Sequence, residues 1–382
     1  MLNWPYLIIA YFSLIVYGFT DNVRGPLFES ILKEFQVNDT LGSLFFSLSS
    51  VSGILLTFVA FKLMQSYNRW TILTFSAFVL FITLNLMALT SHFYFFLSLS
   101  MLYGISAGML SLLPNIFVNL SSPQHLKQQT MSGLHAMYGL ASLVAPLVVN
   151  LFFSWNFDFR KSFMLVSLLP LSLFLFGLYR FSKRLDIQKS YPLQNNQTSL
   201  QSLFSDIRPI WAALILSFYV SAEVLISSRL SLHLSRTHHF TPEQGARYLT
   251  SFFMTLLLSR IFFAFYKPPF SLKNQLATSG VLSVFIFLMA LYIHPLFFIL
   301  LGISMGPFYP HTISFIEKEF TTEINKAISL VAGMSSLSLA CMHFIVGFLT
   351  DHFSVSAALL MGPIFMILAL IMLLTFNERR LV

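Results

Sequence analysis

Apolar runs of bilayer-crossing length follow one another along nearly the whole chain. A helix needs about 20 predominantly apolar residues to cross the hydrocarbon core of a bilayer. Lipid offers no hydrogen-bond partners, so a spanning segment must satisfy its backbone groups internally, as a helix does. The pattern therefore predicts an all-α membrane protein with twelve transmembrane helices. The candidate spans are about 4–30, 40–64, 70–91, 93–120, 128–153, 161–182, 207–235, 243–266, 273–292, 295–318, 323–350 and 355–376.

A long polar segment divides these spans six and six. We expect an N-terminal six-helix bundle at 1–182, a cytoplasmic linker at 183–206 and a C-terminal six-helix bundle at 207–382. Charged residues make up 9% of the chain, against about 25% in soluble domains, so we expect no separate soluble domain. The N-terminus lacks a basic region and a small-residue cleavage site, and we interpret it as a retained first span. The single cysteine, Cys341, excludes an intramolecular disulfide.

Lysines and arginines concentrate on one side of the predicted topology. With a cytoplasmic N-terminus, fifteen of them lie on the cytoplasmic face and five on the other, while Arg24 and Arg229 lie inside spans. This bias predicts a multi-pass protein of the cytoplasmic (inner) membrane with both termini in the cytoplasm. Topology and anionic lipid account for the net charge of +8, so no nucleic-acid partner is expected.

Two opposite charges interrupt the first span. Asp21 and Arg24 fall inside an otherwise apolar stretch, where an ionisable group costs about 2.5–3.5 kcal/mol. Their i, i+3 spacing places them on one helix face, where they can pair. Gly18, Gly25 and Pro26 should weaken the surrounding helix. We interpret this stretch as part of a solute pathway, with a purely structural lock between helices as the alternative.

The two halves of the sequence echo each other. Tyr17 and Asp21 in the first span match Tyr219 and Glu223 in the seventh, 202 residues later. The fourth span carries Gly104 and Gly108, and the tenth carries Gly302 and Gly306 at an offset of 198 residues. Two matches at nearly one offset indicate a duplicated bundle. Duplicated bundles of this kind are typical of alternating-access transporters, which bind solute near the membrane midplane.

Six short segments resemble the major facilitator superfamily and, within it, the fucose–galactose–proton symporter-like group. They are DNVRGPL (21–27), GISAGMLSLLPN (104–115), LHAMYGLASLVAPL (134–147), YVSAEV (219–224), FTPEQGA (240–246) and GPFYP (306–310). The resemblance implies a single-chain secondary transporter for sugars or sugar-like solutes, with protons as the coupling ion.

The chain departs from the resembled group at two places. In that group the fourth span carries a glutamate four residues before an asparagine; here Asn115 is preceded by Ser111, which cannot titrate. The signature acid and glycines of the loop after the second span are missing from 60–69. The first-span acid of the group aligns near Asp21 or Asn22, and of these only Asp21 can carry a proton.

Further polar residues inside spans are candidates for binding or coupling. Glu223 and Arg229 are either a second proton-coupling pair or a permanent bridge, and Arg260 is interpreted as a lipid-contacting residue near a helix end. Sugar hydroxyls need hydrogen-bond donors and acceptors, and a sugar ring packs on aromatic faces. The predicted solute-contacting residues are Asp21, Asn22, Asn115, His135, Tyr138, Tyr309 and His311.

No enzyme motif, cofactor motif or metal-binding pattern is found in the sequence. There is no P-loop, nucleophile turn or paired Cys-x-x-Cys, so transport should be driven by a gradient rather than by ATP. The leading hypothesis is a proton- or gradient-coupled transporter of a small hydrophilic solute such as a sugar or polyol, acting as a monomer in the lipid bilayer. Two alternatives stay open: an exporter of drugs, siderophores or metabolites, and a membrane sensor that binds solute without transport.

Overall fold

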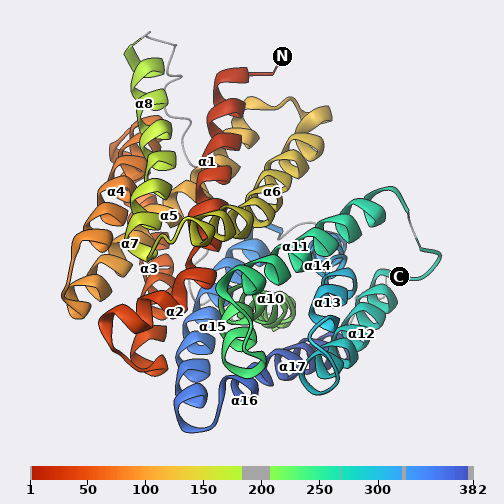
Figure 1. The fold of residues 1–382 in the computed structure, drawn as a ribbon. Helices are drawn as coiled ribbons and strands as arrows, with labels where there is room; N and C mark the ends of the chain where they lie inside the picture. The colour runs from red at the N-terminus through yellow and green to blue at the C-terminus, as the bar shows by residue number, and fades with distance from the viewer. Residues whose placement is uncertain (1, 183–206, 267, 321–323, 377–382) are drawn as a thin grey trace. The chain divides into compact units, whose positions relative to one another are not determined.

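The computed structural model describes residues 2–182, 207–266, 268–320 and 324–376, which form helices and short connections without a strand (Figure 1). The N-terminal half contains α1 (Trp4–Asn22), α2 (Arg24–Phe35), α3 (Asp39–Ser66), α4 (Arg69–Leu89), α5 (Phe93–Ser121), α6 (Lys127–Ser154), α7 (Phe159–Val166) and α8 (Leu168–Ser182). The C-terminal half contains α10 (Arg208–His238), α11 (Pro242–Phe265), α12 (Leu272–Tyr292), α13 (Phe297–Met305), α14 (Phe308–Glu319), α15 (Ile324–His352), α16 (Val355–Leu359) and α17 (Met361–Thr375).

These helices confirm the predicted fold class. Among the described residues, eleven spans are long and apolar enough to cross a membrane, and α1 with α2 makes a twelfth. The chain is thus a multi-pass integral membrane protein. It forms two compact units, Met1–Leu193 and Gln194–Val382. The predicted linker at 183–206 lies outside the described residues.

The same helix pairings recur in both units. In the first unit α1 packs on α6, α3 on α5, and α4 on α5 and α8. In the second unit α10 packs on α15, α11 on α13, and α12 on α13 and α17. Each unit therefore pairs its first span with its fifth, its second with its fourth, and its third with its fourth and sixth, as expected for a duplicated bundle.

The first span is broken close to its charged pair. α1 ends at Asn22, α2 begins at Arg24, and the two helices meet at an angle of 42°. Pro26 supplies the physical reason: proline has no backbone N–H and its ring collides with the carbonyl four residues earlier, here that of Asn22. The break brings Asp21 to the last turn of α1 and Arg24 to the first residue of α2.

The repeated glycines mark close approaches between helices. A Cβ atom on Gly104 of α5 would lie 2.2 Å from the carbonyl oxygen of Ser49 on α3. One on Gly302 of α13 would lie 2.4 Å from the carbonyl oxygen of Phe252 on α11. Both obstacles are backbone atoms, which cannot rotate away as a side chain does.

We therefore expect Gly104→Ala to destabilise the folded protein by about 1–3 kcal/mol, the usual cost of overpacking. Gly333→Ala is the matched control, since a Cβ atom there meets nothing within 4 Å. Thermal unfolding of the purified variants in detergent measures the effect. Equal unfolding midpoints for the two variants would contradict the close helix packing.

Candidate functional site

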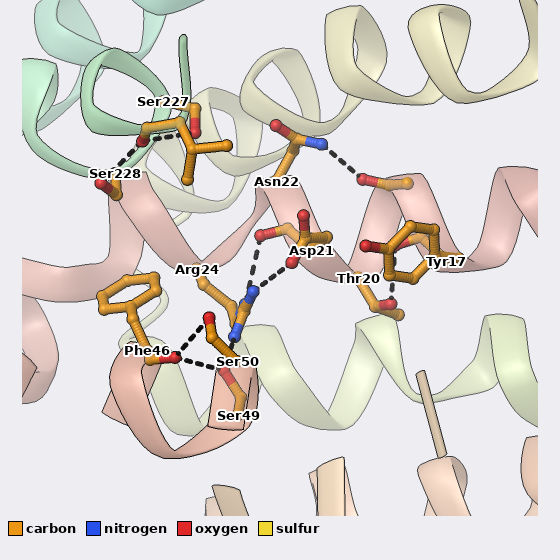
Figure 2. Close-up of polar contacts among 12 residues, drawn as sticks. Tyr17, Thr20, Asp21, Asn22, Arg24, Phe46, Ser49, Ser50, Ser227 and Ser228 are labelled. Atoms are coloured by element: carbon orange, nitrogen blue, oxygen red, sulfur yellow. Dashed lines mark hydrogen bonds and ion pairs between the residues drawn. The ribbon is translucent and has the colours of Figure 1, made fainter. Parts of the chain in front are cut away.

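Asp21 lies at the centre of a polar cluster in the first unit. Arg24 forms an ion pair with Asp21 Oδ1 and also donates from Nε to the Asp21 carbonyl at 3.3 Å, as the i, i+3 spacing predicts (Figure 2). The Tyr138 hydroxyl, on α6, donates to Asp21 Oδ2 at 3.2 Å. The Asp21 side chain keeps 21% of its surface exposed, whereas that of Arg24 keeps only 10%. The carboxylate is thus held by two donors and stays accessible.

Arg24 is fixed by contacts that do not involve Asp21. Its Nη1 donates to the Ser49 hydroxyl on α3 at 3.0 Å, and its guanidinium carbon lies 4.6 Å from the ring centroid of Tyr103. The rings of Phe45 and Phe46 lie 5.4 and 5.2 Å away. Cation–π contacts of this kind stabilise a buried guanidinium, so the arginine is preorganised to face the carboxylate.

Asn22 and Tyr138 join α1 to α6. Asn22 is buried, and its Nδ2 donates to the Gly18 carbonyl at 2.8 Å and to the Ser142 hydroxyl at 3.0 Å. The Tyr138 ring packs on the Tyr17 ring with centroids 5.5 Å apart. The predicted residues Asp21, Asn22 and Tyr138 therefore lie together. The side-chain amide of Asn22 already donates its hydrogen bonds to protein acceptors.

Glu223 lies at the centre of a second cluster, in the other unit. Its Oε2 accepts from Arg260 Nη2 on α11 at 2.9 Å and from the hydroxyl of Tyr219, one turn earlier on α10. The ring of Tyr309 on α14 lies 5.9 Å from the Arg260 guanidinium carbon. The Glu223 side chain is 16% exposed and that of Arg260 is 25% exposed.

This geometry corrects two predictions made from the sequence. The ion pair of Glu223 runs to Arg260, not to Arg229, because six residues of helix turn a side chain well away from the face of its partner. Arg229 is buried within α10 and donates from Nη1 to the Ser228 carbonyl. Arg260 is likewise not a lipid-contacting residue, because its side chain points to the Glu223 carboxylate.

Two prolines in the tenth span explain why α11 presents polar groups there. Pro307 and Pro310 lack the N–H groups that would bond the carbonyls of Ile303 and Gly306, four residues earlier. Ser259 on α11 donates its hydroxyl to the Ile303 carbonyl at 2.7 Å. Arg260 donates from Nε to the Gly306 carbonyl at 3.3 Å. These freed carbonyls are the sequence signal that could have assigned an inward role to Arg260.

The remaining predicted residues are not among the groups that bond the two carboxylates. Asn115 donates from Nδ2 to the Ser111 carbonyl at 2.7 Å, within α5. His135 lies on α6 with an exposed side chain. His311 on α14 packs edge-on against Phe263 of α11, with ring centroids 5.6 Å apart. Their roles in binding stay predictions.

In each unit, therefore, one carboxylate of the first span is bound by one arginine and one tyrosine. In the first unit the arginine follows on the same broken span and the tyrosine comes from α6. In the second unit the tyrosine is on the same helix and the arginine comes from α11. A carboxylate in such a setting can accept hydrogen bonds from a solute hydroxyl or take up a proton. No group of three metal-binding side chains suited to a metal ion occurs among the residues described.

Comparison with known proteins gives consistent matches. A family model described as Major Facilitator Superfamily matches residues 10–324. The chain is 23% identical over 373 residues to a protein called Protein TsgA homolog from Buchnera aphidicola subsp. Baizongia pistaciae (strain Bp), covering 93% of this chain and 91% of that protein. It is 22% identical over 362 residues to the glucose/mannose transporter GlcP of Bacillus subtilis (strain 168), and the match covers 91% of this chain and 88% of that protein. A solved structure of a D-xylose-proton symporter has the same fold, with a TM-score of 0.79 at 14% identity, covering 100% of this chain and 99% of that one.

Proposed function

The chain belongs to the Major Facilitator Superfamily, a superfamily of membrane transporters rather than enzymes, and on this premise we propose that it carries a small hydrophilic solute across the cytoplasmic membrane by alternating access. The observation that carries the proposal is the pair of carboxylates, Asp21 and Glu223, each held inside a span by an arginine and a tyrosine. Ionisable groups inside a membrane are costly, and they typically mark solute or proton pathways.

Sugars or sugar-like polyols are the proposed solute class. The relatives named as transporters act on glucose and mannose or on xylose, and the Asp21 cluster offers the matching chemistry. A partly exposed carboxylate accepts hydrogen bonds from hydroxyl groups, and the neighbouring rings of Tyr17 and Tyr138 provide an aromatic face for a sugar ring. Asn115, His135, Tyr309 and His311 remain further candidates for solute contact.

Protons are the proposed coupling ion, and Glu223 is the proposed carrier. A proton on Glu223 would neutralise the charge that holds Arg260, while a proton on Asp21 would compete with solute binding. The resembled sugar symporters carry an acid in the fourth span at the position that is Ser111 here. Asn115 donates a hydrogen bond to the backbone carbonyl of Ser111. The coupling route in this chain would therefore pass through the second unit.

Counterflow in proteoliposomes tests the proposed function without a guess about the driving ion. Vesicles containing the purified protein are loaded with one unlabelled sugar or polyol at a time, and entry of the same labelled solute from outside is followed. A transient overshoot with at least one sugar is expected. Saturable binding without counterflow for every solute would instead support a membrane sensor, and counterflow confined to drugs or siderophores would support an exporter.

The proposed orientation places both chain ends on the cytoplasmic side. It rests on fifteen lysines and arginines on one face against five on the other. A reporter enzyme that works only in the cytoplasm is expected to be active when fused after Val382. Activity of a reporter that works only outside the cytoplasm, fused at the same position, would reverse the orientation.

A further inference from the structure

Tyr219 contacts both sides of the junction in the tenth span. Its ring stacks on that of Phe308, the first residue of α14, with centroids 4.7 Å apart and planes 6° from parallel. Its hydroxyl lies 2.9 Å from the carbonyl oxygen of Met305, the last residue of α13. The tyrosine is fully buried. A change in the hydrogen bonding of Tyr219 therefore alters the contacts at the junction between α13 and α14.

The same hydroxyl also reaches the carboxylate of Glu223. A phenol has a single hydrogen to donate, whereas two acceptors lie within its reach, Glu223 Oε2 and the Met305 carbonyl. An ionised carboxylate is the stronger acceptor, so the hydroxyl points to Glu223 while that residue is charged. A protonated Glu223 becomes a donor itself. The phenol oxygen can then accept from it, and the phenol hydrogen is left to the Met305 carbonyl.

We propose that Tyr219 is a positioning residue that transmits the charge state of Glu223 to the junction between α13 and α14. The proton taken up stays on Glu223, and Tyr219 keeps its own proton while its hydroxyl turns from one acceptor to the other. In the ionised state the junction is tied to Glu223 through Arg260, which also binds the Gly306 carbonyl. In the protonated state the interaction between Glu223 and Arg260 weakens, and the hydrogen bond from the Tyr219 hydroxyl to the Met305 carbonyl strengthens. The inference rests on proton coupling through Glu223, as proposed above.

The groups that face Glu223 come from several helices. Its own helix α10 contributes Tyr219, α11 contributes Arg260, and α14 contributes Tyr309 beside that arginine. On α15, which also packs on α10, Ser335 and Ser338 bond the hydroxyls of Ser217 and Ser221 rather than Glu223. Among these described contacts, only Tyr219 bonds both the carboxylate and the junction without carrying a charge.

Tyr219→Phe tests the inference, because it removes the hydroxyl and keeps the ring on Phe308. In proteoliposomes we expect solute exchange within about twofold of wild type, while the number of protons moved per solute falls by at least about half. We also expect the pH dependence of uptake to differ from that of wild type, because the ionised carboxylate loses a hydrogen-bond donor. Tyr292→Phe, at a site with 72% of its surface exposed on α12, is the matched control and should resemble wild type.

Three outcomes separate the possible explanations. A lower yield of folded protein, with exchange and uptake reduced equally and an unchanged pH profile, would assign Tyr219 a packing role and overturn the inference. An unchanged proton-to-solute ratio in Tyr219→Phe would overturn it as well. If the wild-type protein itself moves solute without protons, the proposed coupling fails first, and this result is recognised before any variant is made.

Discussion

Replacing Asp21 with asparagine is expected to abolish solute uptake while the protein still folds and reaches the membrane. The Asp21 carboxylate accepts hydrogen bonds from Arg24 and from the Tyr138 hydroxyl. Asparagine is neutral and cannot form an ion pair with the guanidinium. Leaving the Arg24 charge without its carboxylate partner costs about 3–5 kcal/mol. Arg24 should nevertheless stay in place, because Ser49 and the ring of Tyr103 still hold it.

Radiolabelled uptake in cells, together with the amount of protein in isolated membranes, measures this effect. Asp158→Asn is the matched control: Asp158 is exposed and caps the N-terminus of α7 by accepting from the Lys161 N–H, and asparagine caps helices equally well. The control should transport like wild type. Unchanged uptake in Asp21→Asn would give Asp21 a structural role only.

Replacing Glu223 with glutamine is expected to separate exchange from accumulation. Glutamine still accepts a hydrogen bond from Tyr219 but cannot change its charge, so the protonation step is lost. Exchange of solute needs no net proton release and should continue, whereas uptake against a concentration gradient should fall to background. Both fluxes are measured in the same proteoliposomes, with and without an imposed proton gradient.

The ion pair with Arg260 sets the control for this experiment. A merely structural bridge predicts equal loss of exchange and accumulation in Glu223→Gln, because Arg260 would be left buried without its charged partner. The double variant Glu223→Gln/Arg260→Gln removes both charges, and under the structural explanation it should recover both fluxes. Accumulation that persists in Glu223→Gln would exclude this residue as the proton carrier and transfer that role to Asp21 or His135.

The sequence predicted the spans well because apolar length is a direct physical requirement of the bilayer. The predicted third and fourth spans, at 70–91 and 93–120, differ by at most two residues from α4 (Arg69–Leu89) and α5 (Phe93–Ser121). The first span was predicted to end near residue 30, whereas α2 continues to Phe35.

Contacts between residues close together in the sequence could also be predicted, but contacts between distant helices could not. Asp21 and Arg24 still pair across the break between α1 and α2, because Val23 between them keeps a helical backbone conformation and residues i and i+3 stay close. The same reasoning could not connect Glu223 on α10 with Arg260 on α11, since periodicity gives no information about which faces of two helices meet. The prolines at 307 and 310 carried part of that information, because the carbonyls they free require donors from a neighbouring helix.

Proton movement driven by solute tests the central claim most directly. Proteoliposomes containing the protein and an internal pH-sensitive dye, with no imposed gradient, receive from outside a sugar that gave counterflow. The account predicts acidification of the interior with wild-type protein, none with Glu223→Gln, and exchange of the same sugar with both. Sugar entry into wild-type vesicles with no change of internal pH would contradict it.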